Sequence, residues 1–348
     1  MNATIQKSSI VFILKSFFIW RILIFIPIFL APFFFELQKN FLGGGLMSYL
    51  SNPYFWSWAN FDGEHYVNIA RLGYANGEQA FFPLYPLVIK FFGGSILSAL
   101  LISNFCFLFS LIGLYKLIRL DYSEKIAKLT IILLLLFPTS FYFASVYTES
   151  LFLALVVWSF YFFRNKKFFA GIVFGSLSSL TRVIGIIPIG VLGYMGYSKY
   201  KWGDYLAFFH SAKNFGEQRS DHLIILPQVF YRYLVKIIPN LTWDYFPVVF
   251  TTFLEISAAI LFLYLIFIGL KKLKLEYWIF LMAGYLIPTL SGSFSSLPRY
   301  VAVLFPAFIL LAILLEDKNK YFRLGIYASS VIIAVITQML FVRGYFVS

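Results

Sequence analysis

Long apolar stretches alternate along this chain with short polar segments, and most of the stretches approach the length of a helix that crosses a membrane. Such a helix needs about 20 apolar residues. The stretches that fit this pattern are 10–35, 96–118, 129–146, 150–163, 247–270, 277–290, 299–315 and 321–341. The pattern predicts an all-α polytopic membrane protein, a single domain over residues 1–348 with about eleven transmembrane helices.

Two further segments contribute to this count. Residues 168–197 are long enough for one tilted helix, but the alternation of charged loops favours two short passes that meet outside at Arg182. Residues 222–238 contain Arg232 and Lys236, which are unusual within a span. Counting this segment as a crossing lets the later loops alternate correctly in charge.

The longest run without membrane character is 60–86, in which charged residues stand among tyrosines and other aromatics. Most of it belongs to the first predicted external loop, 36–80, in which we expect short helices. Residues 81–93 follow; they contain two prolines and end in Gly93-Gly94. This stretch is too short to cross comfortably, so we expect a re-entrant or interfacial helix.

Composition supports the membrane assignment and orients the chain. Hydrophobic residues make up 61% of the sequence and charged residues only 12%, against about 25% charged in soluble domains. The net charge of +13 comes from short Lys and Arg clusters between apolar runs, which is typical of cytoplasmic loops rather than of nucleic-acid binding. We therefore expect a cytoplasmic N-terminus, an external loop 36–80 and a cytoplasmic amphipathic segment at 199–221.

This topology brings five charged residues from separate segments to the external face. Each has a simple explanation: a carboxylate can cap a helix N-terminus, and an arginine can extend to lipid headgroups. Together they favour a shared cavity at the membrane surface. The five residues are Asp62, Glu64, Glu149, Arg182 and Arg299.

Two of these acids stand in the sequence Asp62-Gly63-Glu64, which fits two kinds of chemistry. The pair could hold a divalent cation through oxygen ligands, or provide one general base with a supporting carboxylate. Gly63 would let the backbone turn sharply. His65 fits a supporting role better than metal ligation, because no second histidine maps to this face. No cofactor is required by the sequence, and a divalent cation remains open.

Several short motifs resemble the PIG-V type of GPI mannosyltransferase and its prokaryotic relatives, within the GT-C class of glycosyltransferases. The resemblance extends over most of the chain. It rests on FDGEHY at 61–66, FFPLYP at 81–86, YTESLF at 147–152, Thr181-Arg182, and Arg299-Tyr300 followed by Pro306.

The resemblance implies a multi-span enzyme that takes a hexose, most commonly mannose, from a polyprenyl-phosphate donor and inverts the anomeric centre. The acid of the family's first external loop maps to Asp62, the general base, with Glu64 beside it. Arg182 and Arg299 would hold the donor phosphate. The remaining residues expected to contact substrate are His65, Tyr66, Tyr85, Glu149 and Tyr300.

The expected partners are a polyprenyl-phosphate sugar, a lipid-linked or cell-surface glycan acceptor and membrane lipids, with the site on the external face of the plasma membrane. Two other functions remain open. A lipid or small-anion transporter would use the same arginines, although the spans show no clear inverted repeat. A non-catalytic subunit of a membrane glycosylation complex would keep the fold without the activity.

Overall fold

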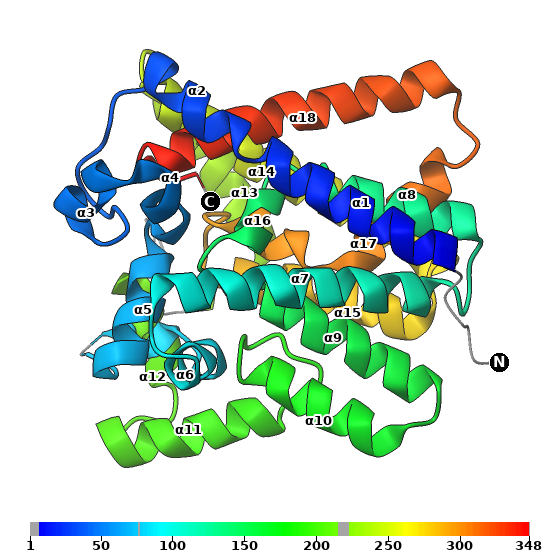
Figure 1. The fold of residues 1–348 in the computed structure, drawn as a ribbon, viewed down its shortest axis with the longest axis horizontal. Coiled ribbons are helices and arrows are strands. Elements are labelled where there is room, and N and C mark those ends of the chain that lie inside the picture. The colour runs from blue at the N-terminus through cyan, green and yellow to red at the C-terminus, as the bar shows by residue number, and fades with distance from the viewer. Residues whose placement is uncertain (1–6, 76, 215–222, 348) are drawn as a thin grey trace.

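A computed structural model describes residues 7–75, 77–214 and 223–347, and this part of the chain consists of helices and connecting turns without strands. Most of the long helices run side by side across the molecule (Figure 1). Four helical stretches are long and apolar enough to cross a membrane by themselves: Lys7–Phe34, Ile96–Ile118, Phe246–Lys272 and Lys320–Val342. The all-helical membrane architecture is confirmed.

The other elements are shorter because prolines, glycines and buried turns break them. Non-helical backbone is tolerated within a membrane protein where other parts of the protein cover it. The helices are α1 (Lys7–Leu23), α2 (Ile26–Phe34), α3 (Gly45–Ser51), α4 (Pro53–Trp56), α5 (Asp62–Leu72), α6 (Leu84–Phe91), α7 (Ile96–Ile118), α8 (Glu124–Leu135), α9 (Glu149–Arg164), α10 (Phe168–Ser179), α11 (Ile189–Trp202), α12 (Ala207–His210), α13 (Leu226–Tyr231), α14 (Phe246–Lys272), α15 (Leu275–Thr289), α16 (Leu297–Ala302), α17 (Phe305–Leu315) and α18 (Lys320–Val342).

Helix α9 forms the centre of the bundle. Every residue from Glu149 to Phe160 is buried, which agrees with a helix that is apolar on all sides. It packs between α7 and α10, and Gly113 of α7 makes the close approach possible, since a Cβ there would lie 2.7 Å from the indole nitrogen of Trp158. The first residue of this central helix is the acid Glu149.

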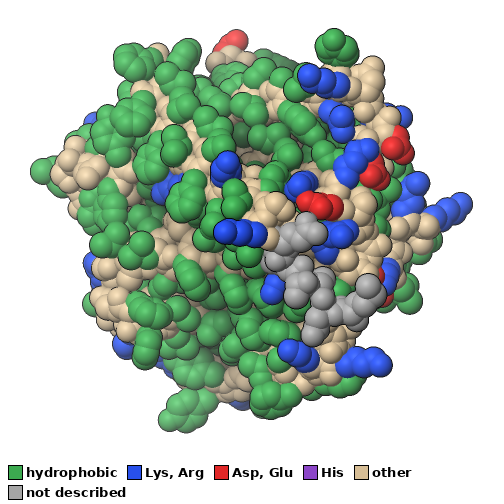
Figure 2. Space-filling model, turned by 45° about the vertical axis from the view of Figure 1, so that its right-hand side comes forward, with side chains coloured by type: hydrophobic (Ala, Val, Ile, Leu, Met, Phe, Trp, Pro, Cys, Tyr) green, Lys and Arg blue, Asp and Glu red, His purple; other side chains and the backbone are tan. Residues whose placement is uncertain are grey.

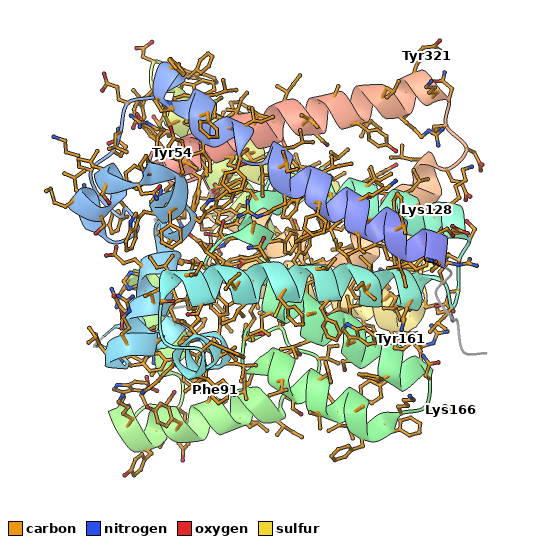
Figure 3. The ribbon with its side chains drawn as sticks, viewed as in Figure 1. Tyr54, Phe91, Lys128, Tyr161, Lys166 and Tyr321 are labelled. Atoms are coloured by element: carbon orange, nitrogen blue, oxygen red, sulfur yellow. The ribbon has the colours of Figure 1, made fainter. Side chains whose placement is uncertain are left out.

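The outer surface suits lipid. Figure 2 shows apolar side chains over much of one face, with Lys and Arg gathered toward its right-hand side. In Figure 3, Lys128 and Lys166 lie near the end of the molecule where α1 begins, whereas Tyr54 and Phe91 lie toward the other end. These two lysines therefore mark a basic end of the bundle, opposite Tyr54 of the loop 36–80.

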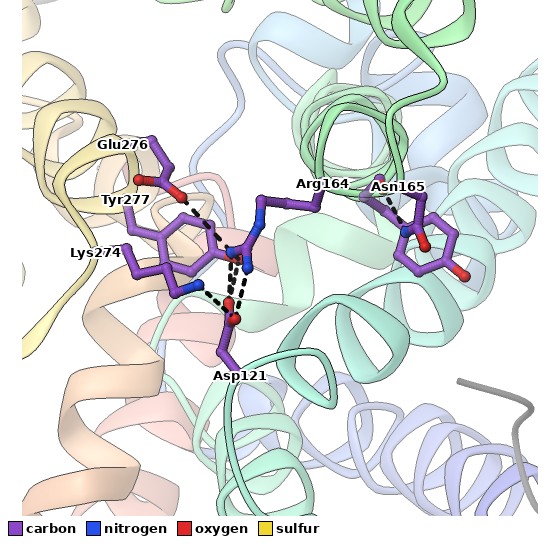
Figure 4. Close-up of polar contacts among 7 residues, drawn as sticks. Asp121, Arg164, Asn165, Lys274, Glu276 and Tyr277 are labelled. Atoms are coloured by element: carbon purple, nitrogen blue, oxygen red, sulfur yellow. Dashed lines mark hydrogen bonds and ion pairs between the residues drawn. The ribbon is translucent and has the colours of Figure 1, made fainter. Parts of the chain in front are cut away.

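At that basic end a compact ion-pair network, the Asp121 cluster, joins three helix termini (Figure 4). Arg164, the last residue of α9, places one nitrogen 2.6 Å from each oxygen of Asp121. Lys274 lies 2.6 Å from the same carboxylate, and the hydroxyl of Tyr277 donates to it at 3.3 Å. Glu276 lies 3.6 Å from Arg164.

The expectation that 199–221 lies opposite the loop 36–80 is wrong for the part that the structure describes. Trp202 packs edge-on against Tyr74, and Tyr194 donates to the carbonyl of Gln79. Lys201 sits 5.7 Å from the Tyr74 ring, so this lysine contacts an aromatic ring of the loop 36–80. Residues 215–221 of the expected segment lie outside the described residues.

The same geometry corrects the predicted passes on either side. Helix α11 continues in the direction of α10 toward α5 and α12 (Figure 1), so 168–197 makes one broken pass instead of two that meet at Arg182. Within 222–238, Ile224 binds the carbonyl of Leu290, and Tyr233 packs on Phe294. Both contacts lie within five residues at the end of α15, so 222–238 stays near that end instead of making the expected crossing.

Candidate active site

Four charged side chains, from three helices and the turn after α10, meet in one network, called here the Asp62 cluster. Arg299 of α16 places Nη1 2.6 Å from Oδ2 of Asp62 and Nε 3.4 Å from Oε1 of Glu149. Arg182, which follows α10, binds the same Oε1 at 3.1 Å. Four of the five residues expected to meet therefore lie in one network, and the fifth, Glu64, does not belong to it.

The cluster is buried, but its hydrogen bonds are incomplete. Glu149 is 1% exposed and Arg299 6%, whereas the Asp62 side chain keeps 21%. Oε2 of Glu149 and Nε of Arg299 have no hydrogen-bond partner. Buried polar atoms without partners are rare and costly, so these two atoms make the cluster a candidate ligand site.

Aromatic rings line the two guanidinium groups. Arg182 lies 4.8 Å from the ring centre of Tyr300, and Arg299 lies 5.1 Å from the same ring. Tyr142 and Tyr147 also face Arg299, at 5.5 and 5.1 Å. Because ring faces attract cations without neutralising them, these contacts hold the arginines in place and leave their charge available.

Backbone strain sits directly before Asp62. Phe61 has φ +55°, a left-handed value that is unusual for a bulky residue. Its N–H donates to the carbonyl of Phe41, which also has positive φ, and the two rings stack with centres 6.1 Å apart. Such strain persists only where surrounding contacts enforce it. Here the strained turn sets the direction in which α5 begins and therefore the position of its first residue, Asp62.

Asn60 makes several of the contacts that hold this turn, although nothing in the sequence singled it out. Its side-chain oxygen accepts from the N–H of Gly43 at 2.9 Å, and its side-chain nitrogen donates to the carbonyl of Phe341 at 2.9 Å. The hydroxyl of Tyr147 donates to its backbone carbonyl at 2.8 Å. The fully buried Asn60 thus ties the loop before Asp62 to the end of α18 and to the start of α9.

Gly63 serves packing instead of the sharp turn that we expected. It lies within helix α5, where a Cβ would meet the backbone oxygen of Val146 at 3.3 Å and the Ala59 Cβ at 3.4 Å. The absence of a side chain lets α5 approach the segment just before Glu149. Asp62 and Glu149 are thereby brought toward the same arginine.

Glu64 does not join the Asp62 cluster. Two helical positions correspond to about 200° of rotation, so Glu64 and Asp62 leave α5 on different sides, and no ion pair joins Glu64 to Arg182 or Arg299. Burial raises the pKa of Glu64, while the nearby His65 opposes the rise. Among the described residues, no group of three or more His, Cys, Asp or Glu could hold a metal ion.

His65 and two of the predicted tyrosines hold the loop together. His65 pairs through Nδ1 with Glu78 at 2.9 Å and stacks on Phe81. Tyr66 is buried edge-on against Tyr85. Tyr85 is fully buried, with its hydroxyl 2.7 Å from Ser103 of α7, so it is not placed to pack on a sugar as expected. Burial raises the pKa of Tyr66, which keeps its hydroxyl neutral.

The helical bundle and its charged site define a polytopic membrane protein with a GT-C-like architecture. The family profile described as Mannosyltransferase (PIG-V) matches residues 4–206, more than half of the chain, and the protein therefore belongs to this family of membrane mannosyltransferases. The match contains Asp62, Glu149 and Arg182, and ends before Arg299. No curated protein and no solved structure matches the chain.

Proposed function

We propose that this membrane mannosyltransferase takes mannose from a polyprenyl-phosphate donor and transfers it, with inversion, to a hydroxyl of a lipid-linked or cell-surface glycan. Asp62 acts as the general base. The observation that carries the proposal is the ion-paired cluster in which the loop carboxylate of Asp62 shares Arg299 with Glu149. A phosphate leaving group is already stable as an anion, so one base is sufficient, unlike in glycoside hydrolysis.

The charges of the cluster suit this reaction. Two carboxylates and two guanidinium groups give a formal charge of zero before substrate binds. During transfer, the C–O bond between the anomeric carbon and the donor phosphate breaks, and the phosphodiester, with one negative charge, becomes a phosphomonoester with two. The acceptor oxygen forms the new bond, and its proton passes to Asp62, whose negative charge disappears.

Arg299 would therefore exchange one anionic partner for another. As Asp62 becomes neutral, the guanidinium loses its carboxylate and can meet the charge that develops on the phosphate. Charge-assisted bonds that strengthen in this way stabilise the transition state more than the ground state. Arg182 would hold the second phosphate oxygen, and the unpartnered oxygen of Glu149 would accept a sugar hydroxyl.

The site is proposed to face the outside of the plasma membrane. The Asp62 cluster lies at the opposite end of α9 from Arg164 and the Asp121 cluster, and the loops that carry Lys166 and Lys274 lie at the Arg164 end. A positive-inside orientation puts those loops in the cytoplasm and the Asp62 cluster outside. Nucleotide sugars are absent there, which favours a lipid-linked donor.

The direct test is mass spectrometry of products formed when purified protein in lipid vesicles receives labelled polyprenyl-phosphate mannose and a membrane glycan extract. We expect an acceptor that gains one labelled hexose and the release of polyprenyl phosphate. Movement of the intact donor between leaflets without sugar transfer would overturn the proposal and favour a transporter.

A further inference from the structure

An irregular loop, 291–296, joins α15 to α16 and is largely enclosed by the protein. Phe294 is 0% exposed and Ser296 1%. Buried non-helical backbone in a membrane protein needs hydrogen-bond partners from the protein itself, because lipid offers none. This loop leads directly into the helical turn that carries Arg299, so its conformation decides where that guanidinium lies.

Side chains from distant segments satisfy this backbone. Arg232 donates to the carbonyl of Gly292 at 3.2 Å, and the N–H of Phe294 donates to the hydroxyl oxygen of Tyr233 at 3.1 Å. The ring of Tyr233 also packs on Phe294, with centres 4.8 Å apart. One tyrosine therefore fixes both the backbone and the side chain at the middle of the loop.

Glu255 sets the direction of that tyrosine hydroxyl. Glu255 lies within the candidate span α14, is 6% exposed, and accepts a hydrogen bond from Tyr233 at 2.7 Å. A hydroxyl has one hydrogen, so donation to the carboxylate turns a lone pair toward the N–H of Phe294. An ionisable side chain inside a span is costly and is therefore a candidate for function.

The loop needs such support because its backbone is strained. Ser296 has φ +65°, a left-handed value that an L-residue adopts only under constraint. Three residues later, Arg299 enters the Asp62 cluster. Without the bond to Phe294, the strained turn before α16 can relax, and the arginine moves with it.

We propose that Glu255 and Tyr233 are positioning residues, which hold the loop 291–296 so that Arg299 meets Asp62 and Glu149. Their effect on sugar transfer rests on the proposed function, whereas their effect on the loop does not. Neither residue lies within the region matched by the family profile, residues 4–206.

The test compares Tyr233→Phe with Tyr285→Phe in the full-length protein. Tyr285 is an equally buried tyrosine whose hydroxyl donates to the carbonyl of Ala259 in α14, away from the loop. Tyr233→Phe should speed hydrogen–deuterium exchange in a peptide covering 291–299 and lower kcat about ten- to a hundredfold, as a small displacement of a catalytic group does. Tyr285→Phe should change neither.

Two further variants separate positioning from general stability. Glu255→Gln keeps an oxygen that accepts from Tyr233 and should retain most of the activity, whereas Glu255→Leu should behave like Tyr233→Phe. The residual transfer rate of Arg299→Lys can be followed over long incubations. Adding Tyr233→Phe to this variant should lower that rate little further, because the guanidinium that Tyr233 positions has already been replaced.

A wild-type rate of hydrogen–deuterium exchange at 291–299 in Tyr233→Phe would overturn the inference. It would also be overturned if the losses of kcat caused by Tyr233→Phe and by Arg299→Lys multiply in the double variant. If exchange rises in Tyr233→Phe while the wild-type protein transfers no mannose from the labelled donor, the positioning role is retained and the proposed function fails. The two ideas can therefore fail separately.

Discussion

Helix α9 ends in a charged cluster at each terminus, and the two clusters are built differently. At its last residue, Arg164 makes two parallel bonds to Asp121, which also binds Lys274 and Tyr277. At its first residue, Glu149 shares one oxygen between two arginines and leaves the other oxygen without a partner. Both oxygens of Asp121 have charged partners, which suits a structural link between helix ends. In the Asp62 cluster, one oxygen of Glu149 has no partner and could still bind a ligand.

The largest expected effect comes from removing the charge of the proposed base. Asp62→Asn keeps the shape of the side chain but cannot accept a proton, so kcat should fall about 10²- to 10⁴-fold, measured with labelled polyprenyl-phosphate mannose. Binding of polyprenyl phosphate should be retained or strengthened, because Arg299 loses a competing anion. A folded, inserted variant with wild-type turnover would remove Asp62 from the mechanism.

The arginines at the two ends of the bundle give a matched pair. Arg182→Gln should lower kcat about a hundredfold and raise the KM for donor, because it removes one group that stabilises the leaving phosphate. Arg164→Gln should leave turnover per folded molecule near wild type and lower the melting temperature in detergent. If both variants lose activity to the same degree, the functional contrast between the clusters is wrong.

The stability of the Asp121 cluster should depend on pH. Burial raises the pKa of Asp121, but hydrogen bonds from Arg164 and Lys274 outweigh it, and the pKa lies below its usual value. A lowered carboxyl pKa stabilises the folded protein above the unfolded pKa of about 3.9 and loses that effect as pH falls through the folded value. Asp121→Asn should therefore destabilise by about 1.5–3 kcal/mol at pH 7.

Thermal unfolding in detergent at a series of pH values measures this effect. The difference between Asp121→Asn and wild type should shrink as the pH is lowered below about 4. A difference that stays constant with pH would mean that the charge of Asp121 is not what stabilises the cluster.

Glu64→Gln gives the smallest expected effect and tests whether the second acid of the loop takes part. Because burial raises the pKa of Glu64, its charged form costs stability once the pH rises above the unfolded pKa of about 4.3. The glutamine variant should be slightly more stable at neutral pH, by up to about 0.5 kcal/mol, with turnover near wild type. A large loss of turnover would return Glu64 to the mechanism.

The sequence predicted the four charged residues that gather, wrongly added Glu64 to them, and did not predict how they are held. Asp62, Glu149, Arg182 and Arg299 each stand next to an apolar segment where charge is costly, so their meeting could be anticipated. The contribution of Asn60 could not, because a buried asparagine that binds three distant segments has no local signal. Charge counting also failed to place 199–214 beside the loop 36–80, where Lys201 packs against the rings of Tyr74 and Trp202.

The bond from Asn60 to the carbonyl of Phe341 has a consequence for how the protein is made. The loop that carries Asp62 leaves the ribosome early, whereas its partner in α18 is synthesised 281 residues later. Until α18 is made and inserted, this loop lacks one of its anchors, and fewer contacts hold the strained turn at Phe61. The position of Asp62 is therefore fully fixed only after α18 has joined the bundle.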